Sequence, residues 1–284
     1  MTEHLLHSAV VPSRRRPRAR ALACLFATLL QVCALPALAL AQDDDLPDST
    51  QLDQGRHEGL PAIEQPFRAG ESLRFSVQYG FIKAGSAWLE VPEVVDWNGR
   101  PCWRLVARAE SNGFFDKVYK VRNRIESVWD QRGQFSWRYF EDRHEGHYTA
   151  NDTIVYDTTA HTARYKNGQT YPIPASVQDA LSSFYFTRFQ ALPIGGSVTF
   201  DYHASRKSAP LEVKVLGRQR VKTPAGKFDC VVIEPMLKAG GIFKNKGRLV
   251  IWLTDDERRM PVLMKSKVLI GSISVVLQEA RPGT

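Results

Sequence analysis

Residues 73–79 read Leu-Arg-Phe-Ser-Val-Gln-Tyr, so apolar and polar side chains alternate along this stretch. Successive side chains of a β-strand point to opposite faces, and the alternation therefore predicts a strand with one buried face. Similar runs follow at 87–91 and 102–107, and Asn98-Gly99 between them is typical of a tight hairpin turn. The folded part of the chain is thus predicted to begin as an antiparallel meander.

The same texture continues toward the C-terminus. We expect further strands at 121–130, 134–142, 146–157, 160–166, 197–204, 211–217, 228–235, 248–254, 261–268 and 271–279. Short strands at this spacing indicate an all-β, mainly antiparallel fold rather than alternating βαβ units. We expect a curved sheet, or an open or half barrel, that wraps one amphipathic helix.

The helix is expected where the periodicity changes. Ser176 can cap a helix with Asp179 three residues later, and Pro193 ends the run. The apolar residues then share one face at helical spacing: Val177, Leu181, Phe184, Tyr185 and Phe189. We favour a packing role for this face, with Leu181, Phe184 and Tyr185 turned into the cavity of the barrel, and keep ligand contact as the alternative.

The two halves of the chain resemble each other. Residues 70–75 are similar to residues 195–200, and each run leads about thirty residues later to a strand that carries a cysteine. The hypothesis is an internal pseudo-repeat, which favours one domain made of two similar curved sheets.

The first 41 residues look like a secretory signal. Five arginines between Arg14 and Arg20 precede the uncharged stretch 21–41, which ends in Ala39-Leu40-Ala41. We expect cleavage before Gln42, with an uncleaved anchor as the alternative. Cleavage lowers the formal net charge from +8 to +4, so a nucleic-acid partner is not expected. Residues 42–66 are polar and are predicted to be a disordered linker, and residues 67–280 a single β-rich domain.

Export changes the meaning of the cysteines. Cys102 and Cys230 remain after cleavage, in a compartment that permits disulfides. Both lie in strand-like runs, so they are either a disulfide pair or two buried small apolar residues.

Several motifs together identify the chain as resembling a bacterial family, domain-of-unknown-function family 3108. The motifs are Lys222-Thr223-Pro224-Ala225-Gly226-Lys227-Phe228-Asp229, Gly240-Gly241-Ile242-Phe243-Lys244, Ile251-Trp252-Leu253-Thr254-Asp255-Asp256-Glu257-Arg258-Arg259, Tyr79-Gly80, Lys83-Ala84-Gly85 and Ala109-Glu110-Ser111-Asn112-Gly113. The resemblance covers roughly residues 67 to 280 and implies an exported, all-β envelope protein of Gram-negative bacteria. It supplies no activity and no catalytic residues. The expected architecture is also similar to the open barrels that carry lipids or lipoproteins across the periplasm, a likeness of fold alone.

The search for catalytic and metal-binding motifs gives little. His144 and His147 are three residues apart in a strand-like run, so they should point to opposite faces and we expect no metal. Residues 241–248 lack the Gly-Lys-Ser/Thr end of a phosphate-binding loop, so no cofactor is expected. Asp255, Asp256 and Glu257 fit a charged turn better than an acid/base pair.

Two segments place apolar side chains beside glycine and follow them with cations. The candidate ligand or membrane contacts are Phe114, Phe115, Lys117, Tyr119, Lys120 and Arg122 in the first segment, and Ile242, Phe243, Lys244, Lys246 and Arg248 in the second. Apolar side chains can bury the hydrocarbon of an anionic amphiphile while the neighbouring cations attract its head group. The alternative is that the aromatic residues plug the ends of the barrel.

These observations lead to three hypotheses. The leading one is a periplasmic, non-enzymatic binding or chaperone-like protein that holds an amphipathic ligand, a lipid or lipoprotein, during envelope biogenesis. The second is an interaction module for an outer-membrane protein complex, using an exposed strand edge or the two segments. The third is a hydrolase of envelope glycans, which needs two converging carboxylates, with Glu145, Asp255, Asp256 and Glu257 as candidates.

Overall fold

The computed structural model describes residues 64–239, 242–243, 248–267 and 271–284. Almost all of the described part is β-structure, with two short helices. The strands are β1 Glu71–Tyr79, β2 Ile82–Trp97, β3 Arg100–Ser111, β4 Val121–Asp130, β5 Ser136–Glu145, β6 Tyr148–Asp157, β7 Thr162–Tyr165, β8 Thr170–Pro172, β9 Ser197–Ala204, β10 Lys207–Thr223, β11 Gly226–Ala239, β12 Ile242–Phe243, β13 Leu249–Thr254, β14 Pro261–Lys267 and β15 Ser272–Arg281; the helices are α2 Gly113–Tyr119 and α3 Ser182–Thr187.

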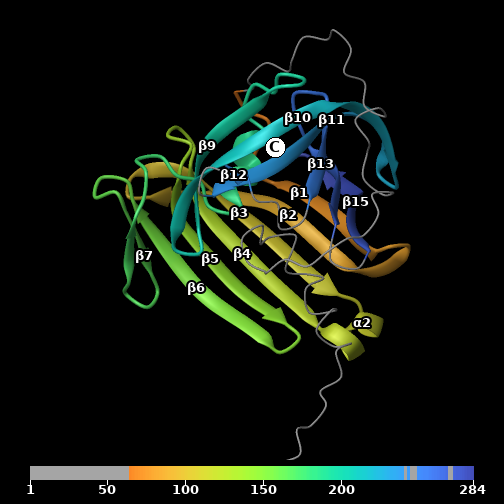
Figure 1. The fold of residues 1–284 in the computed structure, drawn as a ribbon, viewed down its shortest axis with the longest axis horizontal. Helices are drawn as coiled ribbons and strands as arrows, with labels where there is room; N and C mark the ends of the chain where they lie inside the picture. Colours follow the sequence, from red (N-terminus) through yellow and green to blue (C-terminus); the bar gives the residue numbers. More distant parts are fainter. Residues whose placement is uncertain (1–63, 240–241, 244–247, 268–270) are drawn as a thin grey trace, which may run out of the picture.

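The strands form one antiparallel sheet. Its order runs from β8 down to β1, then to β15, β14, β13, β11, β10 and β9, while β12 pairs only with β11. The sheet curves strongly, so that β9 and β10 lie above the concave side of β3 to β6 (Figure 1). It is not closed by strand pairing, because β8 and β9 form its two ends. The expected all-β fold of an open barrel around a helix is therefore confirmed.

Two successive meanders make up this sheet. The first strand of the chain, β1, pairs with the last, β15, with Val77 opposite Val275. This pairing joins the meander β1 to β8 to the meander β9 to β15. The expectation of two similar sheets is wrong for this reason: the two similar halves are continuous through β1 and β15. Alternation alone could not show it, since an alternating strand pairs equally well at either of its edges.

The helical segment is shorter than predicted. Ser176 does not cap a helix, because the backbone at Gln178 instead forms a bridge to Tyr202 of β9. Asp179 takes the capping role: its Oδ1 accepts hydrogen bonds from the backbone N–H groups of Leu181 and Ser182, each at 2.8 Å. α3 therefore spans only Ser182–Thr187.

Two hydrophobic clusters share the interior of the barrel. One is aromatic and lies inside β3 to β7, where the rings of Trp103 and Trp129 stack 5.4 Å apart and Phe67 packs on Trp103 at 5.0 Å. The other is mainly aliphatic and lies inside β1, β10, β11 and β13 to β15. α3 stands between them, and Phe184 packs against both. The difference in side-chain size matters for the site described below.

The two cysteines are buried free thiols. Cys102 lies in β3 and Cys230 in β11, and five strands separate these two in the sheet, so the disulfide alternative is not realised. Burial raises the pKa of each thiol to about 12. Each Sγ donates instead to a carbonyl of its own strand, Arg100 O at 3.5 Å and Phe228 O at 3.6 Å.

The signal and most of the linker lie outside the described residues. Of the predicted linker, 64–66 are described, and Pro66 is already buried. Among the described residues, no helix combines the length and the apolar character that crossing a membrane requires.

Candidate functional site

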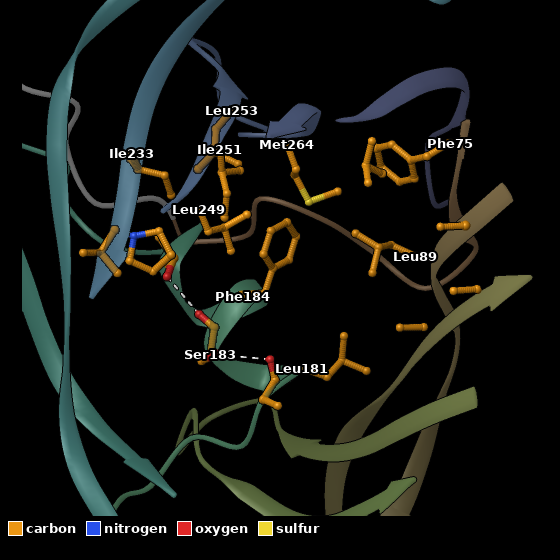
Figure 2. A pocket seen from close by; sticks show the side chains of 18 of the residues that line it. Phe75, Leu89, Leu181, Ser183, Phe184, Ile233, Leu249, Ile251, Leu253 and Met264 are labelled. Carbon is orange, nitrogen blue, oxygen red and sulfur yellow. Dashed lines mark hydrogen bonds between the residues drawn. The ribbon is translucent and has the colours of Figure 1, made fainter. Parts of the chain in front are cut away.

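An apolar cavity of about 140 Å³ lies between α3 and the concave face of the sheet. Figure 2 shows Phe184 projecting from α3 into its middle, with Leu249, Ile251 and Met264 on one side and Leu89 on the other. The lining comes from strands of both meanders and is dominated by aliphatic side chains. An engineered cavity of roughly this volume, lined by similar side chains, binds benzene. The site is therefore sized for a short hydrocarbon segment.

The cavity exists because small side chains face α3 at one place. Ala87 of β2 stands opposite Ala109 of β3, and Leu89 stands opposite Ala107. These alanines and Ala180 all line the cavity. Phe184, which faces this space, stays only partly buried. Where the neighbouring cluster has tryptophan rings, this part of the sheet has methyl groups, and the volume is left unfilled.

Buried polar contacts fix the N-terminal end of α3. Asp179 Oδ1 also accepts from Ser127 Oγ at 2.8 Å, and Ser136 Oγ lies 2.7 Å from Ser182 Oγ. Trp129 Nε1 donates to Gln178 Oε1 at 2.9 Å. All these groups are buried, so each contact avoids the cost of an unpaired polar atom inside the barrel.

An arginine fixes the other end. Arg188, the C-terminal cap of α3, is fully buried and donates through Nη1 and Nη2 to the two carboxylate oxygens of Glu71, at 2.7 and 2.8 Å. Its guanidinium also donates to Arg258 O at 2.9 Å and lies 4.9 Å from the centre of the Phe67 ring. The helix is thereby tied to β1 and to the β13–β14 turn, which holds Phe184 over the cavity.

The structure divides the predicted helix face between the two clusters. Leu181 and Phe184 line the cavity. Tyr185 does not: its ring packs 4.9 Å from Phe67 in the aromatic cluster. The reason is that Phe184 and Tyr185 are consecutive residues of α3, and consecutive residues of a helix do not share a face.

The first apolar and basic segment forms α2 rather than a loop. Asn112 caps it by accepting from the N–H groups of Phe114 and Phe115. Phe114 is 70% exposed, Phe115 is half-buried and Tyr119 is buried. Lys117 and Lys120 are exposed, whereas Arg122 is tied to Asp116 by an ion pair of 2.7 Å, which lowers the pKa of that carboxyl group.

The second segment is described only in part. Ile242 and Phe243 form β12, which pairs with Lys238 and Ala239 of β11. Lys244 and Lys246 lie outside the described residues. Arg248 lies 3.2 Å from Glu234 in an ion pair.

A further exposed apolar group lies beside α2, outside the residues predicted as contacts. Phe81 lies in the turn between β1 and β2 and is fully exposed, and Ile82, the first residue of β2, is 58% exposed. The side chain of Asn112 donates to Lys83 O at 2.6 Å, so this turn and α2 are adjacent. With Phe114 and Val118, these residues form an apolar tip, which we call the α2 tip. Exposed cations stand beside it: Lys83, Lys117 and Lys120. The pattern Phe81-Ile82-Lys83 at a turn was the available signal.

The carboxylates that were candidates for hydrolysis do not form a pair, and three of the four bind different partners. Glu145 of β5 binds Arg143 at 2.8 Å. Asp255 binds Arg218 at 2.6 Å, and Asp256 accepts backbone hydrogen bonds within the β13–β14 turn, where Glu257 is exposed. None of these four carboxylates lines the apolar cavity.

His144 and His147 belong to no group of possible metal ligands in the described ranges. His144 is exposed beside Asp142, and His147 lies in the turn between β5 and β6. Within the described ranges, no three His, Cys, Asp or Glu side chains are grouped so that they could hold a metal ion.

Comparison with solved structures shows that the architecture occurs elsewhere. A β-barrel-like protein of the domain of unknown function DUF1849 from Brucella abortus has a TM-score of 0.53 at 8% identity, over 79% of this chain and 99% of that one. A protein from Parabacteroides distasonis described as a lipoprotein has a TM-score of 0.36 at 14% identity, over 78% and 99%. An exported protein with a YmcC-like fold from Bacteroides fragilis has a TM-score of 0.29 at 13% identity, over 78% and 99%.

The sequence comparisons place the chain in a family without assigning an activity. No curated protein matches it. The model of the family described as protein of unknown function (DUF3108) matches residues 74–278, most of the chain. The chain therefore belongs to the DUF3108 family.

Proposed function

We propose that this protein binds an amphipathic ligand in the bacterial envelope, with a hydrocarbon segment of a lipid or lipoprotein held in the cavity under Phe184. The observation that carries the proposal is the apolar cavity between α3 and the alanine-lined part of the sheet. Burying hydrocarbon there gains roughly 25 cal/mol for each Å² of apolar surface removed from water. The protein is proposed to act by binding and transport, not as an enzyme.

The α2 tip supports contact with a membrane surface. Phe81, Ile82, Phe114 and Val118 present apolar side chains to solvent at one place. Exposed lysines stand beside them at 83, 117 and 120. Apolar side chains that enter the acyl boundary, beside cations that approach anionic head groups, give reversible attachment of a peripheral protein. The α2 tip would bring the barrel to the lipid surface from which its ligand comes.

The site of action is proposed to be the periplasm. The support is the sequence of residues 1–41, with its arginines, its uncharged stretch and the Ala39-Leu40-Ala41 site. An exported protein with an apolar cavity suits the movement of lipids or lipoproteins between membranes.

The test is to fill the cavity without disturbing the fold. Ala109→Leu adds a larger side chain to the open volume, whereas Ala280→Leu makes the same change at an exposed position of β15. The probe is N-phenyl-1-naphthylamine, a dye whose fluorescence rises in apolar surroundings. We expect the Ala109→Leu variant to bind it at least tenfold more weakly, with unchanged or higher thermal stability because the cavity is filled.

Native mass spectrometry of the protein purified from the periplasm gives a second readout. The wild type and the Ala280→Leu variant should carry a lipid-sized adduct that the Ala109→Leu variant has lost. Equal dye binding by all three proteins, or no adduct on any of them, overturns the proposal. A single dominant protein partner in cross-linking, without lipid, would favour the interaction-module hypothesis instead.

A further inference from the structure

The two ends of the sheet meet across a seam that side chains hold together. Tyr165 of β7 places its hydroxyl 2.9 Å from Nε2 of His203 in β9. Ser208 Oγ donates to Pro172 O, 3.3 Å away, and so connects β10 with β8. Beside these contacts, the segment before α3 bonds to β9, since His203 N donates to Gln178 O at 2.9 Å.

A second cavity, of about 230 Å³, lies along this seam and differs in chemistry from the first. Tyrosines, acids and one arginine dominate its lining. The polar residues are Tyr139, Glu141, Tyr148, Asp152, Tyr165, Asp179, Tyr202, His203, Ser205 and Arg206. None of them was predicted as a site residue, because they come from β5, β6, β7, β9, the turn between β9 and β10, and the segment before α3.

Asp179 places a buried carboxyl group in this lining. Its side chain is 1% exposed, and its Oδ1 is used to cap α3. Its Oδ2 is buried and accepts no hydrogen bond from any residue of the described part. Burial raises the pKa of this carboxyl group. A buried carboxyl oxygen without a partner costs free energy, and a ligand that donates a hydrogen bond to it would recover that cost.

The seam cavity and the apolar cavity share part of their walls. Ala180 and Tyr202 line both of them. The two cavities therefore adjoin at these residues, and one molecule with hydrocarbon under Phe184 and its polar end in the seam would span this boundary. The two cavities together match the two parts of an amphiphile.

The lining indicates which polar end fits. Glu141, Asp152 and Asp179 offer acceptors, while the tyrosine hydroxyls and Arg206 offer donors. A hydroxyl group both donates and accepts, so it suits such a mixed lining. A phosphate or sulfate only accepts and would face three acids and one arginine, and an ammonium group only donates.

We propose that the seam cavity binds an uncharged, hydroxyl-rich head group, such as a sugar or glycerol, of the amphiphile whose hydrocarbon occupies the apolar cavity, and that Asp179 Oδ2 receives a hydrogen bond from it. This inference rests on the proposed function, since it assigns the head group of the same ligand. Glu141, which accepts from the Tyr139 hydroxyl at 3.2 Å, lines the same cavity, so an anionic head group would approach two carboxyl groups there.

The experiment compares four octyl amphiphiles below their micelle concentrations by isothermal titration calorimetry with the full chain. Octyl glucoside carries the proposed head group; octyl sulfate, octyltrimethylammonium and octylphosphocholine carry charged ones. We expect the glucoside to bind at least tenfold more tightly than each of the others. Dye binding is measured in parallel to report the apolar cavity alone.

Two variants locate the effect. Asp179→Asn keeps a side-chain oxygen to cap α3 but places an N–H donor where Oδ2 was. Glu141→Gln changes the second acid without touching the cap. Both should lose the preference for the glucoside, about tenfold in affinity, and still bind the dye as the wild type does. Ala109→Leu should weaken all four amphiphiles and the dye together.

The outcomes separate the two proposals. If neither dye nor amphiphile binds, the proposed function fails. If the dye binds but the sulfate or ammonium amphiphile binds as tightly as the glucoside, the head-group assignment alone is wrong. The same holds if the Glu141→Gln variant keeps the full preference for the glucoside.

Discussion

Arg188 and Glu71 form a two-pronged ion pair inside the barrel, with N–O distances of 2.7 and 2.8 Å. The arginine is fully buried and the glutamate 5% exposed, although they are 117 residues apart in the sequence. The pair joins the end of α3 to β1, the strand that holds the two meanders together. The position of Phe184 in the cavity therefore depends on a contact between two residues that do not line the cavity themselves.

Replacing Arg188 with alanine should lower the free energy of unfolding by about 3–5 kcal/mol, because Glu71 stays buried without its partner. Arg188→Lys should recover only part of this, since an ammonium group cannot make two parallel hydrogen bonds. Urea unfolding followed by tryptophan fluorescence measures both. The control is Arg74→Ala, which breaks an exposed ion pair between β1 and β15 and should shift the midpoint little. Equal shifts for Arg74→Ala and Arg188→Ala would contradict this account.

Gly85 is predicted to tolerate no side chain. A Cβ atom there would stand 2.1 Å from the Glu110 carbonyl oxygen of the neighbouring strand β3. Gly85→Ala must push β2 and β3 apart, at a cost of about 1–3 kcal/mol. Gly113, with nothing within 4 Å of the same position, is the matched control. Thermal unfolding of both alanine variants tests the difference; a drop of equal size in both would show that the close approach of the strands is not the cause.

Much of the fold could be predicted from local patterns, and the exceptions have physical causes. β4 at Val121–Asp130 and β9 at Ser197–Ala204 begin and end where their alternation predicts. The predicted start of the helix was wrong because both Ser176 and Asp179 are residue types that cap helices. Only the bridge from Gln178 to β9 decides between them. Long-range pairing of this kind leaves no local trace in a sequence.

The lining of the cavities could be predicted only in part: Leu181 and Phe184 were expected to face the inside of the barrel, but the sheet residues opposite them were not identified. The apolar one depends on Ala87 standing opposite Ala109, a register that alternation by itself does not fix. The seam cavity depends on β7 and β9 meeting through Tyr165 and His203, residues from separate meanders. The exposed residues at the α2 tip were partly predictable, because Phe114 and the lysines follow a visible pattern, but the contribution of Phe81 required the contact between Asn112 and Lys83.

His203 should make stability depend on pH. Burial lowers the pKa of this imidazole from 6.5 to about 4. As the pH falls below 6.5, the unfolded chain takes up a proton at this residue and the folded protein does not, so stability is lost until about pH 4, by roughly 3 kcal/mol in all. Asp179 and Glu141, whose pKa values are raised, act in the opposite direction. Urea unfolding at several pH values, compared between wild type and His203→Gln, isolates the histidine: the variant should lose less stability on acidification, and an unchanged slope would refute the prediction.

Phe114→Asp should weaken attachment to membranes without weakening the fold. The ring is 70% exposed at the α2 tip, so a carboxylate there costs little in folding but repels anionic lipid and removes apolar surface from the contact. Co-sedimentation with phosphatidylglycerol vesicles should show several-fold less bound protein, and Phe81→Asp should behave alike.

Phe115→Asp cannot serve the same purpose, because that ring is half-buried and its loss also affects packing. The matched control is Val94→Asp, which changes an exposed apolar residue of β2 that lies twelve residues along the strand from Ile82. If Val94→Asp reduces sedimentation as much as Phe114→Asp does, added negative charge rather than the α2 tip explains the loss, and the membrane-contact assignment falls.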